Sequence, residues 1–233
     1  MEFLNTEVWG FQHALRGMRN PMNSWNLSDS LLNIDCDECT LNECDKCTTY
    51  NDTGYIIGKN DMKLAQSLIA GGSEHSKFLR MIHVAVDINM PRYWWSEADT
   101  YHFNTKNSCS TMHKLLNNTK PITKDLFVFC EEDIDIVEIV VKRLEELRQE
   151  FKKIQETTAG NKNEKLNRLL LRAKRLLMEG FLQLRTFDTN YAELRNMYHQ
   201  RKHHRLHEEW ADTFCKWVES LPYATEFILY TGE

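Results

Sequence analysis

Hydrophobic and polar residues alternate most regularly over residues 80–88, in R-M-I-H-V-A-V-D-I. On one side of an extended chain this segment carries the apolar residues Ile82, Val84, Val86 and Ile88. A period of two is typical of a β-strand with one buried face, so the segment predicts a strand. Pro91 suits the first turn of a helix that follows. We expect the aromatic side chains of that helix to pack in the core: Tyr93, Trp94 and Trp95.

Helical periodicity dominates the middle of the chain. From about 132 to 157, apolar residues recur at steps of three and four while Glu and Lys fill the other positions. A second segment, from about 163 to 180, follows the linker T-A-G-N-K-N. Such spacing predicts two amphipathic helices that pair as an antiparallel hairpin. Their charges are typical of a solvated face and indicate no function.

Start and stop residues indicate the remaining elements. Asn60 or Asp61 can cap a helix over residues 60–69, and the two glycines at 71 and 72 can end it. Residues 1–27 contain a proline and several amides typical of an irregular turn, so we expect a loop there. The last third predicts two further helices, 189–205 and 208–221.

Composition and charge exclude several classes of protein. The chain has 233 residues with 42% hydrophobic and 27% charged side chains, which suits one large domain with a real core. No apolar run approaches the roughly 18 residues that would cross a bilayer. The formal net charge of −5 supplies no general attraction to nucleic acid. Because the first residues do not follow the pattern of a secretion signal, we expect a cytoplasmic protein without a membrane or nucleic-acid partner.

Four of the seven cysteines lie within twelve residues, as two C-x2-C pairs. They are Cys36, Cys39, Cys44 and Cys47. Without an export signal, metal binding or free thiols are favoured over disulfides. Four thiolates can complete the closed tetrahedral site of a structural zinc. Only four residues separate the pairs, a shorter gap than is usual, so a thiol-rich loop without metal stays open as the alternative.

The predicted helix near residue 190 carries polar groups suited to a heterocyclic or anionic ligand. Asn190 and Arg201 are eleven residues apart, so they share one stripe of a helix, and Asn196 lies on another side. Arginine offers a planar fork to a phosphate or carbonyl, and an amide offers both a donor and an acceptor. A polar helix face in water is the alternative. A histidine row at steps of four, more typical of a basic surface than of a metal site, comprises His199, His203 and His207.

The segment T-N-Y-A-E-L-R-N-M-Y-H-Q-R resembles the flavin-dependent thymidylate synthases, whose late helix carries two asparagines and an arginine at this spacing. Upstream, G-G-S-E-H precedes the predicted strand, much as the family's G-H-x-x-x-F-E-H segment precedes its first hydrophobic strand. N-S-C-S supplies Asn107 and Ser110, which match the Asn and Ser after the family's R-H-R triplet. Near the start, R-G-M-R-N-P-M-N-S-W lies where the family has A-R-x-S. The similarity covers most of the chain in outline.

The resemblance implies an α+β fold, with an antiparallel or mixed sheet flanked by helices and the long helical hairpin. It implies one domain over 1–233, with a cysteine-rich excursion at 35–48 and the hairpin at 132–181. The implied enzyme transfers a one-carbon unit from a folate to C5 of dUMP or a related uracil nucleotide. FAD is the implied cofactor, NADPH a further partner, and a homotetramer with shared sites the implied assembly.

The resemblance also assigns roles to individual residues. Residues 107–113 become the wall of a nucleotide pocket. Catalytic roles fall to Arg201 and Ser110; cofactor binding to Asn190, Asn196, His75 and His102; substrate binding to Asn107, Ser110, Thr111 and Arg201. Reduced flavin carries both the methylene group and the hydride in this family, so no protein nucleophile is needed. We therefore interpret Cys109 as a packed thiol.

The family's cationic triplet is absent from this chain. Thr100, Tyr101 and His102 stand where the family has Arg, His and Arg, and Met112 replaces another arginine. In the family the triplet helps to hold the flavin and the nucleotide. A second hypothesis follows: a non-catalytic or repurposed relative that keeps a nucleotide pocket and has lost the flavin site.

Overall fold

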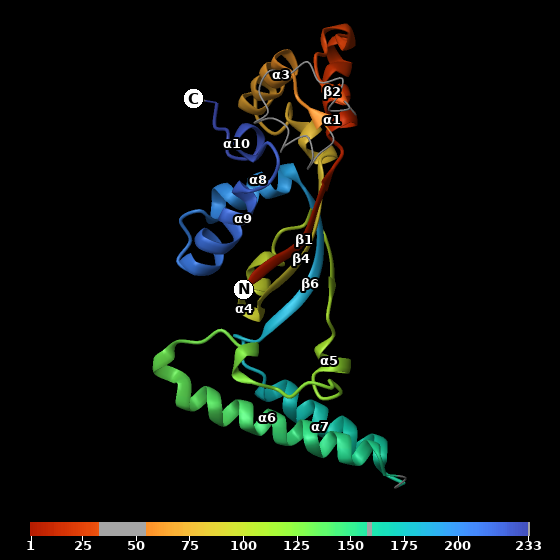
Figure 1. Cartoon of the computed structure of the whole chain (residues 1–233), viewed down its shortest axis with the longest axis vertical. Coiled ribbons are helices and arrows are strands. Elements are labelled where there is room, and N and C mark those ends of the chain that lie inside the picture. Colours follow the sequence, from red (N-terminus) through yellow and green to blue (C-terminus); the bar gives the residue numbers. More distant parts are fainter. Residues whose placement is uncertain (33–54, 158–159, 233) are drawn as a thin grey trace, which may run out of the picture. The chain divides into compact units, whose positions relative to one another are not determined.

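The computed structural model describes residues 1–32, 55–157 and 160–232 (Figure 1). Contacts divide the chain into two compact units, which are described separately. Unit 1 comprises Met1, Ile88–Thr100 and Asn107–Arg185. Unit 2 comprises Glu2–Asp87, Tyr101–Lys106 and Thr186–Glu233. The single-domain hypothesis stays a prediction. Every helix in the described ranges is too short or too polar to cross a bilayer.

A four-stranded antiparallel sheet runs through the fold, with helices flanking it, which confirms the predicted α+β class. Its strands, in spatial order, are β1 (Glu2–Trp9), β4 (His83–Pro91), β6 (Leu182–Asn190) and β5 (Thr105–Ser108). The predicted strand is β4, whose alternate residues from Val84 to Met90 are buried. It begins at His83 because a 3₁₀ helix, Lys77–Met81, precedes it. A short antiparallel pair joins β2 (Leu31–Leu32) to β3 (Tyr55–Ile56).

The expected loop over residues 1–27 is wrong. Residues 2–9 form β1, and α1 (Phe11–Arg19) follows it. The physical reason lies in four apolar residues at helical spacing, all buried: Phe11, Ala14, Leu15 and Met18. Gly10 makes the turn between strand and helix at φ 102°, a conformation that disfavours other residues. Short 3₁₀ helices follow at Asn20–Met22 and Trp25–Leu27.

Helix α3 (Lys59–Ala70) occupies the predicted place but is capped differently. Its N-cap is Gly58, and the side chain that serves the first turn comes from Asp29. The Asp29 carboxylate accepts hydrogen bonds from the backbone nitrogens of Asn60 and Asp61 at 2.9 and 3.1 Å. Asp61, expected to cap the helix, is instead fully buried in an ion pair with Arg19.

The predicted helix over 189–205 is shorter than expected. Helix α8 (Tyr191–Arg201) ends at Arg201, so the three spaced histidines do not share one continuous helix. The predicted helix over 208–221 is present as a π-helical segment, Glu208–Cys215, continued by α9 (Lys216–Glu219). Helix α10 (Ala224–Phe227) lies beyond it and packs on α3.

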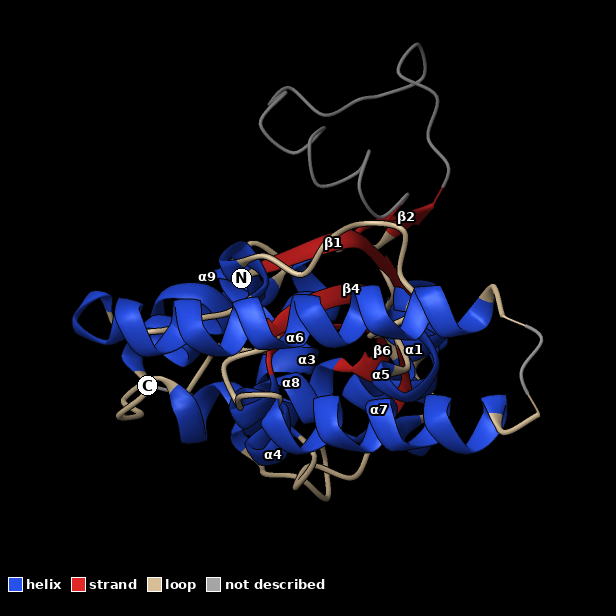
Figure 2. Cartoon of the chain, turned by 90° about the horizontal axis from the view of Figure 1, so that it is seen from below, coloured by secondary structure: helices blue, strands red, loops and turns tan. Residues whose placement is uncertain are grey.

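Unit 1 contains the two predicted long helices as α6 (Ile134–Gln155) and α7 (Lys162–Leu176), which pack side by side (Figure 2). Their shared core includes Leu144, Leu147, Leu169 and Ala173. Helix α4 (Arg92–Ala98) buries Trp94 and Trp95 completely, and the short helix α5 (Thr111–Lys114) follows β5. Two 3₁₀ helices, Lys124–Leu126 and Glu131–Asp133, lead into α6.

An ionised Glu145 holds the loop before α6 in unit 1. Its carboxylate accepts from Arg148 Nε and Nη2 at 2.7 and 2.6 Å and from the Ile122 backbone nitrogen at 2.9 Å. The Arg148 hydrogen bonds lower the pKa of Glu145 to about 2, against the opposing effect of burial. Because the pKa is lower in the folded state, ionised Glu145 stabilises that state at pH values above its ordinary pKa of 4.5. This stabilisation is lost as the pH falls toward 2.

Glu145→Gln is therefore expected to lower the free energy of unfolding by about 1–3 kcal/mol at pH 7, and by less below pH 3. Chemical denaturation at several pH values measures this difference. Glu146→Gln is the matched control, since its pair with Arg143 is half exposed and should contribute less than about 1 kcal/mol. Equal losses in the two variants would contradict the prediction.

Candidate functional site

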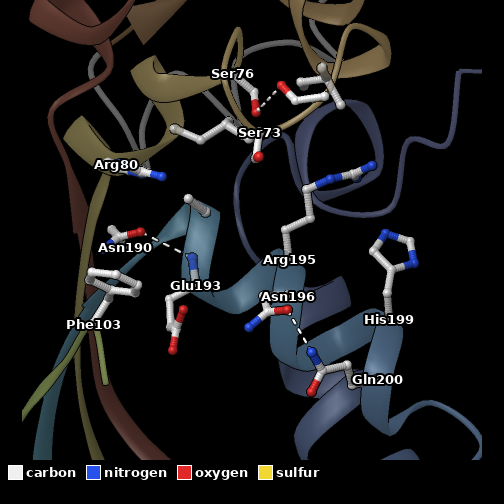
Figure 3. Close-up of a pocket in the computed structure, with 14 residues that line it drawn as sticks. Ser73, Ser76, Arg80, Phe103, Asn190, Glu193, Arg195, Asn196, His199 and Gln200 are labelled. Atoms are coloured by element: carbon white, nitrogen blue, oxygen red, sulfur yellow. Dashed lines mark hydrogen bonds between the residues drawn. The ribbon is translucent and has the colours of Figure 1, made fainter. Parts of the chain in front are cut away.

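A cavity of about 550 Å³ lies within unit 2 (Figure 3). Four parts of the chain line it: the end of α3 with the turn after it, the 3₁₀ helix Lys77–Met81, the loop before β5, and α8 with its N-cap. Its polar lining residues are Ser73, Ser76, Arg80, Asn190, Glu193, Arg195, Asn196, His199 and Gln200. Phe103 adds an aromatic face. A cavity of this size with a few convergent polar groups is typical of a site for a small molecule or cofactor.

Helix α8 presents most of these groups because of where it begins and how it repeats. Asn190 is its N-cap, and the Asn190 Oδ1 accepts from the Glu193 backbone nitrogen at 3.0 Å. From that start, residues three and four apart share one face. The face toward the cavity carries Ala192, Arg195, Asn196, His199 and Gln200.

Two guanidinium groups give the cavity positive charge. Arg80 lies 5.9 Å from the centroid of the Phe103 ring. Arg195 donates from Nη1 to the carbonyl oxygens of Phe227 and Ile228, at 3.4 and 2.6 Å. Burial lowers the pKa of Arg195 below its usual range, yet an arginine in a protein stays protonated. With the carboxylate of Glu193 also in the lining, the two arginines leave a net positive charge, which suits an anionic ligand.

His199 adds a neutral group to the same wall. Burial, and next the charge of Arg195, lower the pKa of His199 below 6.5. Its Nε2 lies 3.0 Å from the Ile228 carbonyl oxygen. At neutral pH the ring is uncharged, so this nitrogen carries the proton that bonds the carbonyl.

Arg201 follows the cavity-lining residues on α8 but does not line the cavity. Its Nε donates to the Tyr101 hydroxyl at 2.8 Å. The guanidinium carbon lies 5.4 Å from the Tyr101 ring centroid and 4.7 Å from that of Trp210. Aromatic rings that face a guanidinium hold its plane in one orientation.

Unit 1 contains a smaller cavity, of about 160 Å³, at the hydroxyl-rich segment. Cys109, Ser110 and Thr111 line it, together with Lys114 and apolar residues such as Phe181. Lys174 Nζ donates to the Thr111 Oγ1 at 2.5 Å. Burial, and next the charge of Arg92, lower the pKa of Lys174 below 10.5. Lys174 does not line the cavity itself but holds the Thr111 hydroxyl that does, and Lys114 and Ser110 add an ammonium and a second hydroxyl to the lining. Such a set of groups suits a phosphate.

The residues assigned from sequence are distributed over several places. Asn190 and Asn196 come together in the larger cavity, whereas Ser110 and Thr111 line the smaller one. His75 lines a separate groove of unit 2. His102 and Asn107 are exposed and line none of the cavities described here. Arg201 belongs to unit 2 and Ser110 to unit 1. All these roles stay predictions.

Of the nine polar lining residues of the larger cavity, sequence reasoning assigned only Asn190 and Asn196 to a site. It missed the other seven: Ser73, Ser76, Arg80, Glu193, Arg195, His199 and Gln200. For two of them a signal existed. Arg195 and His199 are four residues apart and flank Asn196, so a helix through 190–201 places all three near one another. Ser73, Ser76 and Arg80 come from a turn and a 3₁₀ helix more than a hundred residues earlier. No local pattern links them to α8.

The cysteine cluster lies outside the described residues. Within the described ranges, no group of three or more His, Cys, Asp or Glu side chains is arranged to hold a metal ion. Zinc therefore stays a prediction for Cys36, Cys39, Cys44 and Cys47. Of the cysteines that the structure describes, Cys109 and Cys130 are exposed, whereas Cys215 is buried. The packed thiol expected at Cys109 is wrong, because its side chain reaches the solvent beside the smaller cavity.

Two solved structures of flavin-dependent thymidylate synthase from Helicobacter pylori, each containing FAD and dUMP, are similar to this chain. One has a TM-score of 0.65 at 18% identity and covers 99% of both chains. The other has a TM-score of 0.67 at 16% identity and covers 100% of this chain and 99% of that chain. No protein-family model matches the sequence, and no curated protein matches it. The chain therefore has the fold of the flavin-dependent thymidylate synthases.

Proposed function

We propose that this chain is a flavin-dependent thymidylate synthase-like enzyme that transfers a one-carbon unit to C5 of dUMP or a related uracil nucleotide. The observation that carries the proposal is the cavity of unit 2, where Asn190 and Asn196 stand beside two arginines within a fold whose solved relatives contain FAD and dUMP. Folate and NADPH would be the further substrates. A homotetramer would be the working assembly.

The larger cavity would hold the flavin cofactor. Arg80 and Arg195 would neutralise its diphosphate, since guanidinium groups pair well with phosphate oxygens. Ser73 and Ser76 add hydroxyl groups, and Phe103 offers a face for a ring. The volume and these groups fit a dinucleotide cofactor that lies partly in solvent. When bound, reduced flavin would supply the reducing and one-carbon-transfer chemistry.

The smaller cavity of unit 1 would hold the phosphate of the nucleotide. Lys174 would place its charge there, next to the Thr111 hydroxyl that it already contacts. Ser110 is held in place because its hydroxyl caps α5, accepting from the His113 backbone nitrogen at 3.3 Å. The resemblance assigns nucleotide contacts to Asn107 and to Arg201 as well. These residues bind and orient the substrate, and none of them attacks it.

The first test is whether the protein binds FAD and whether Asn196 contributes. Purified protein titrated with FAD should quench flavin fluorescence with saturation, and Asn196→Ala should weaken binding about tenfold through one lost hydrogen bond. Asn167→Ala, an exposed change on α7, is the control and should bind as the wild type does. A wild-type protein that takes up no FAD would overturn the proposed function.

The alternative function is a nucleotide-binding relative that does not use flavin. Tyr101 favours it, because this residue replaces the histidine of the family's triplet and is buried against Arg201. Tyr101 carries no positive charge, so it cannot supply the charged contact to a flavin that the family's triplet makes. Titration with dUMP separates the two functions: saturable dUMP binding without FAD binding would support the alternative.

A further inference from the structure

Four polar side chains of unit 2 form a continuous line of hydrogen bonds that ends at the larger cavity. Arg201 Nε donates to the Tyr101 hydroxyl at 2.8 Å, and that hydroxyl donates to Gln200 Oε1 at 3.0 Å. Gln200 Nε2 then donates to Asn196 Oδ1 at 2.7 Å, as Figure 3 shows. Tyr101 is 7% exposed, and its ring also faces the Arg201 guanidinium.

The direction of each bond in this line follows from the chemistry of its first member. An arginine Nε carries a hydrogen and has no lone pair to accept one, so the Tyr101 oxygen must be the acceptor. The hydroxyl hydrogen is then available to Gln200, which must present its oxygen. Its nitrogen consequently faces Asn196, and that amide must present its own oxygen. The Asn196 Nδ2 is left for another partner.

The polarity of an amide decides which ligand edge it recognises. Among the described residues, Asn196 Nδ2 has no hydrogen-bond partner, and Asn196 lines the cavity. An isolated asparagine can turn over and present either its oxygen or its nitrogen. Here the oxygen is held by Gln200, so the cavity receives a donor.

We propose that Tyr101 and Gln200 are positioning residues that fix Asn196 as a hydrogen-bond donor to an acceptor edge of the bound cofactor, such as a ring carbonyl. The inference rests on the proposed function, because it takes FAD as the ligand of this cavity. Tyr101, which stands in the place of the family's histidine, would thereby have a role of its own. Through the same hydroxyl, it joins the orientation of Arg201 to that of Asn196.

A double-mutant cycle on FAD affinity tests the proposal. Tyr101→Phe keeps the ring over the guanidinium but removes the hydroxyl, and it should weaken FAD binding about three- to tenfold. In an Asn196→Ala background the same change should cost less than about twofold, because the group it orients is gone. Tyr198→Phe is the matched control. Its hydroxyl bonds Glu219 at 2.7 Å outside the cavity, and FAD affinity should not change.

A second variant acts on the other positioning residue. Gln200→Met keeps the length of the side chain and the Tyr101–Arg201 bond while removing the bond to Asn196. It should weaken FAD binding in the wild-type background and have little effect in the Asn196→Ala background. Thermal unfolding of each variant shows whether a loss of FAD affinity comes from misfolding.

The outcomes separate this inference from the proposed function. Losses that multiply in the double variants, in a protein that binds FAD, would overturn the positioning role alone. Wild-type protein that binds no FAD would overturn both. Losses that do not multiply, with unfolding midpoints close to that of the wild type, support the positioning role.

Discussion

Replacing Asp61 by asparagine is expected to lower the free energy of unfolding by about 3–5 kcal/mol, because it leaves a buried guanidinium without its counter-charge. Asp61 is completely buried and Arg19 is 3% exposed. The Arg19 Nε lies 2.5 Å from Asp61 Oδ1. Since a folded domain is stable by only about 5–15 kcal/mol, this single change removes a large share of the total.

The second carboxylate oxygen of Asp61 also accepts hydrogen bonds. Its Oδ2 accepts from the hydroxyls of Ser28 and Ser30 at 2.7 and 2.5 Å, and from the Ser30 backbone nitrogen at 3.2 Å. An asparagine cannot accept at both positions, so one neighbouring donor loses its partner. The carboxylate thus joins α1 and α3 to the segment before β2.

The same contacts determine how the contribution of Asp61 to the free energy of unfolding depends on pH. Burial alone would raise the pKa of Asp61, but hydrogen bonds from Ser30, Ser28 and Arg19, with the charge of Arg19, hold the pKa below 3.8. A lowered pKa gives stability that is present above 3.8 and is lost as pH falls through the folded-state value. Asp61→Asn should therefore differ most from the wild type at neutral pH and least in strong acid.

Urea unfolding followed by circular dichroism measures this loss at pH 7. Asp212→Asn serves as the control, because Asp212 pairs with His207 and Lys216 on the exposed surface, where solvent screens the pairs and they contribute little. If Asp61→Asn cost no more than Asp212→Asn, the buried pair would contribute nothing to the stability of unit 2.

The elements that are predicted correctly from sequence are those that bury one face and therefore carry apolar residues at a regular spacing. Strand β4 alternates because one face is buried, and α6 and α7 show a helical period because each buries one stripe. Strand β1 buries too little to alternate, so only neighbouring strands reveal it. Helix α1 did carry a helical pattern, which the turn residues after it obscured.

The candidate site is only partly predictable for a different reason. Asn190 and Asn196 share one helix, so their spacing suffices to place them together. The role of Asp61 was missed because its partner, Arg19, lies 42 residues away and a cap is the commoner use of an aspartate near a helix start. From sequence alone, Tyr101 appears only as the replacement of the family's histidine. Its contact with Arg201, 100 residues later, is known only from the structure.

Lys174→Met is expected to weaken dUMP binding about 10- to 100-fold, if the smaller cavity holds the nucleotide phosphate. A hydrogen bond between an ammonium and a phosphate is worth about 1.5–3 kcal/mol, and about 1.4 kcal/mol corresponds to a tenfold change. Because burial and the charge of Arg92 lower the pKa of Lys174, this contribution should disappear at a lower pH than for an ordinary lysine as the pH is raised.

Calorimetric titration with dUMP and with deoxyuridine separates a phosphate contact from a structural one. The nucleoside lacks the phosphate, so Lys174→Met should leave its affinity unchanged while reducing that of the nucleotide. Lys174→Arg keeps the charge and should restore most of the dUMP affinity. Lys142→Met, an exposed change on α6, is the control. Equal losses for dUMP and deoxyuridine would mean that Lys174 only supports Thr111. An unchanged dUMP affinity would remove the phosphate from this cavity.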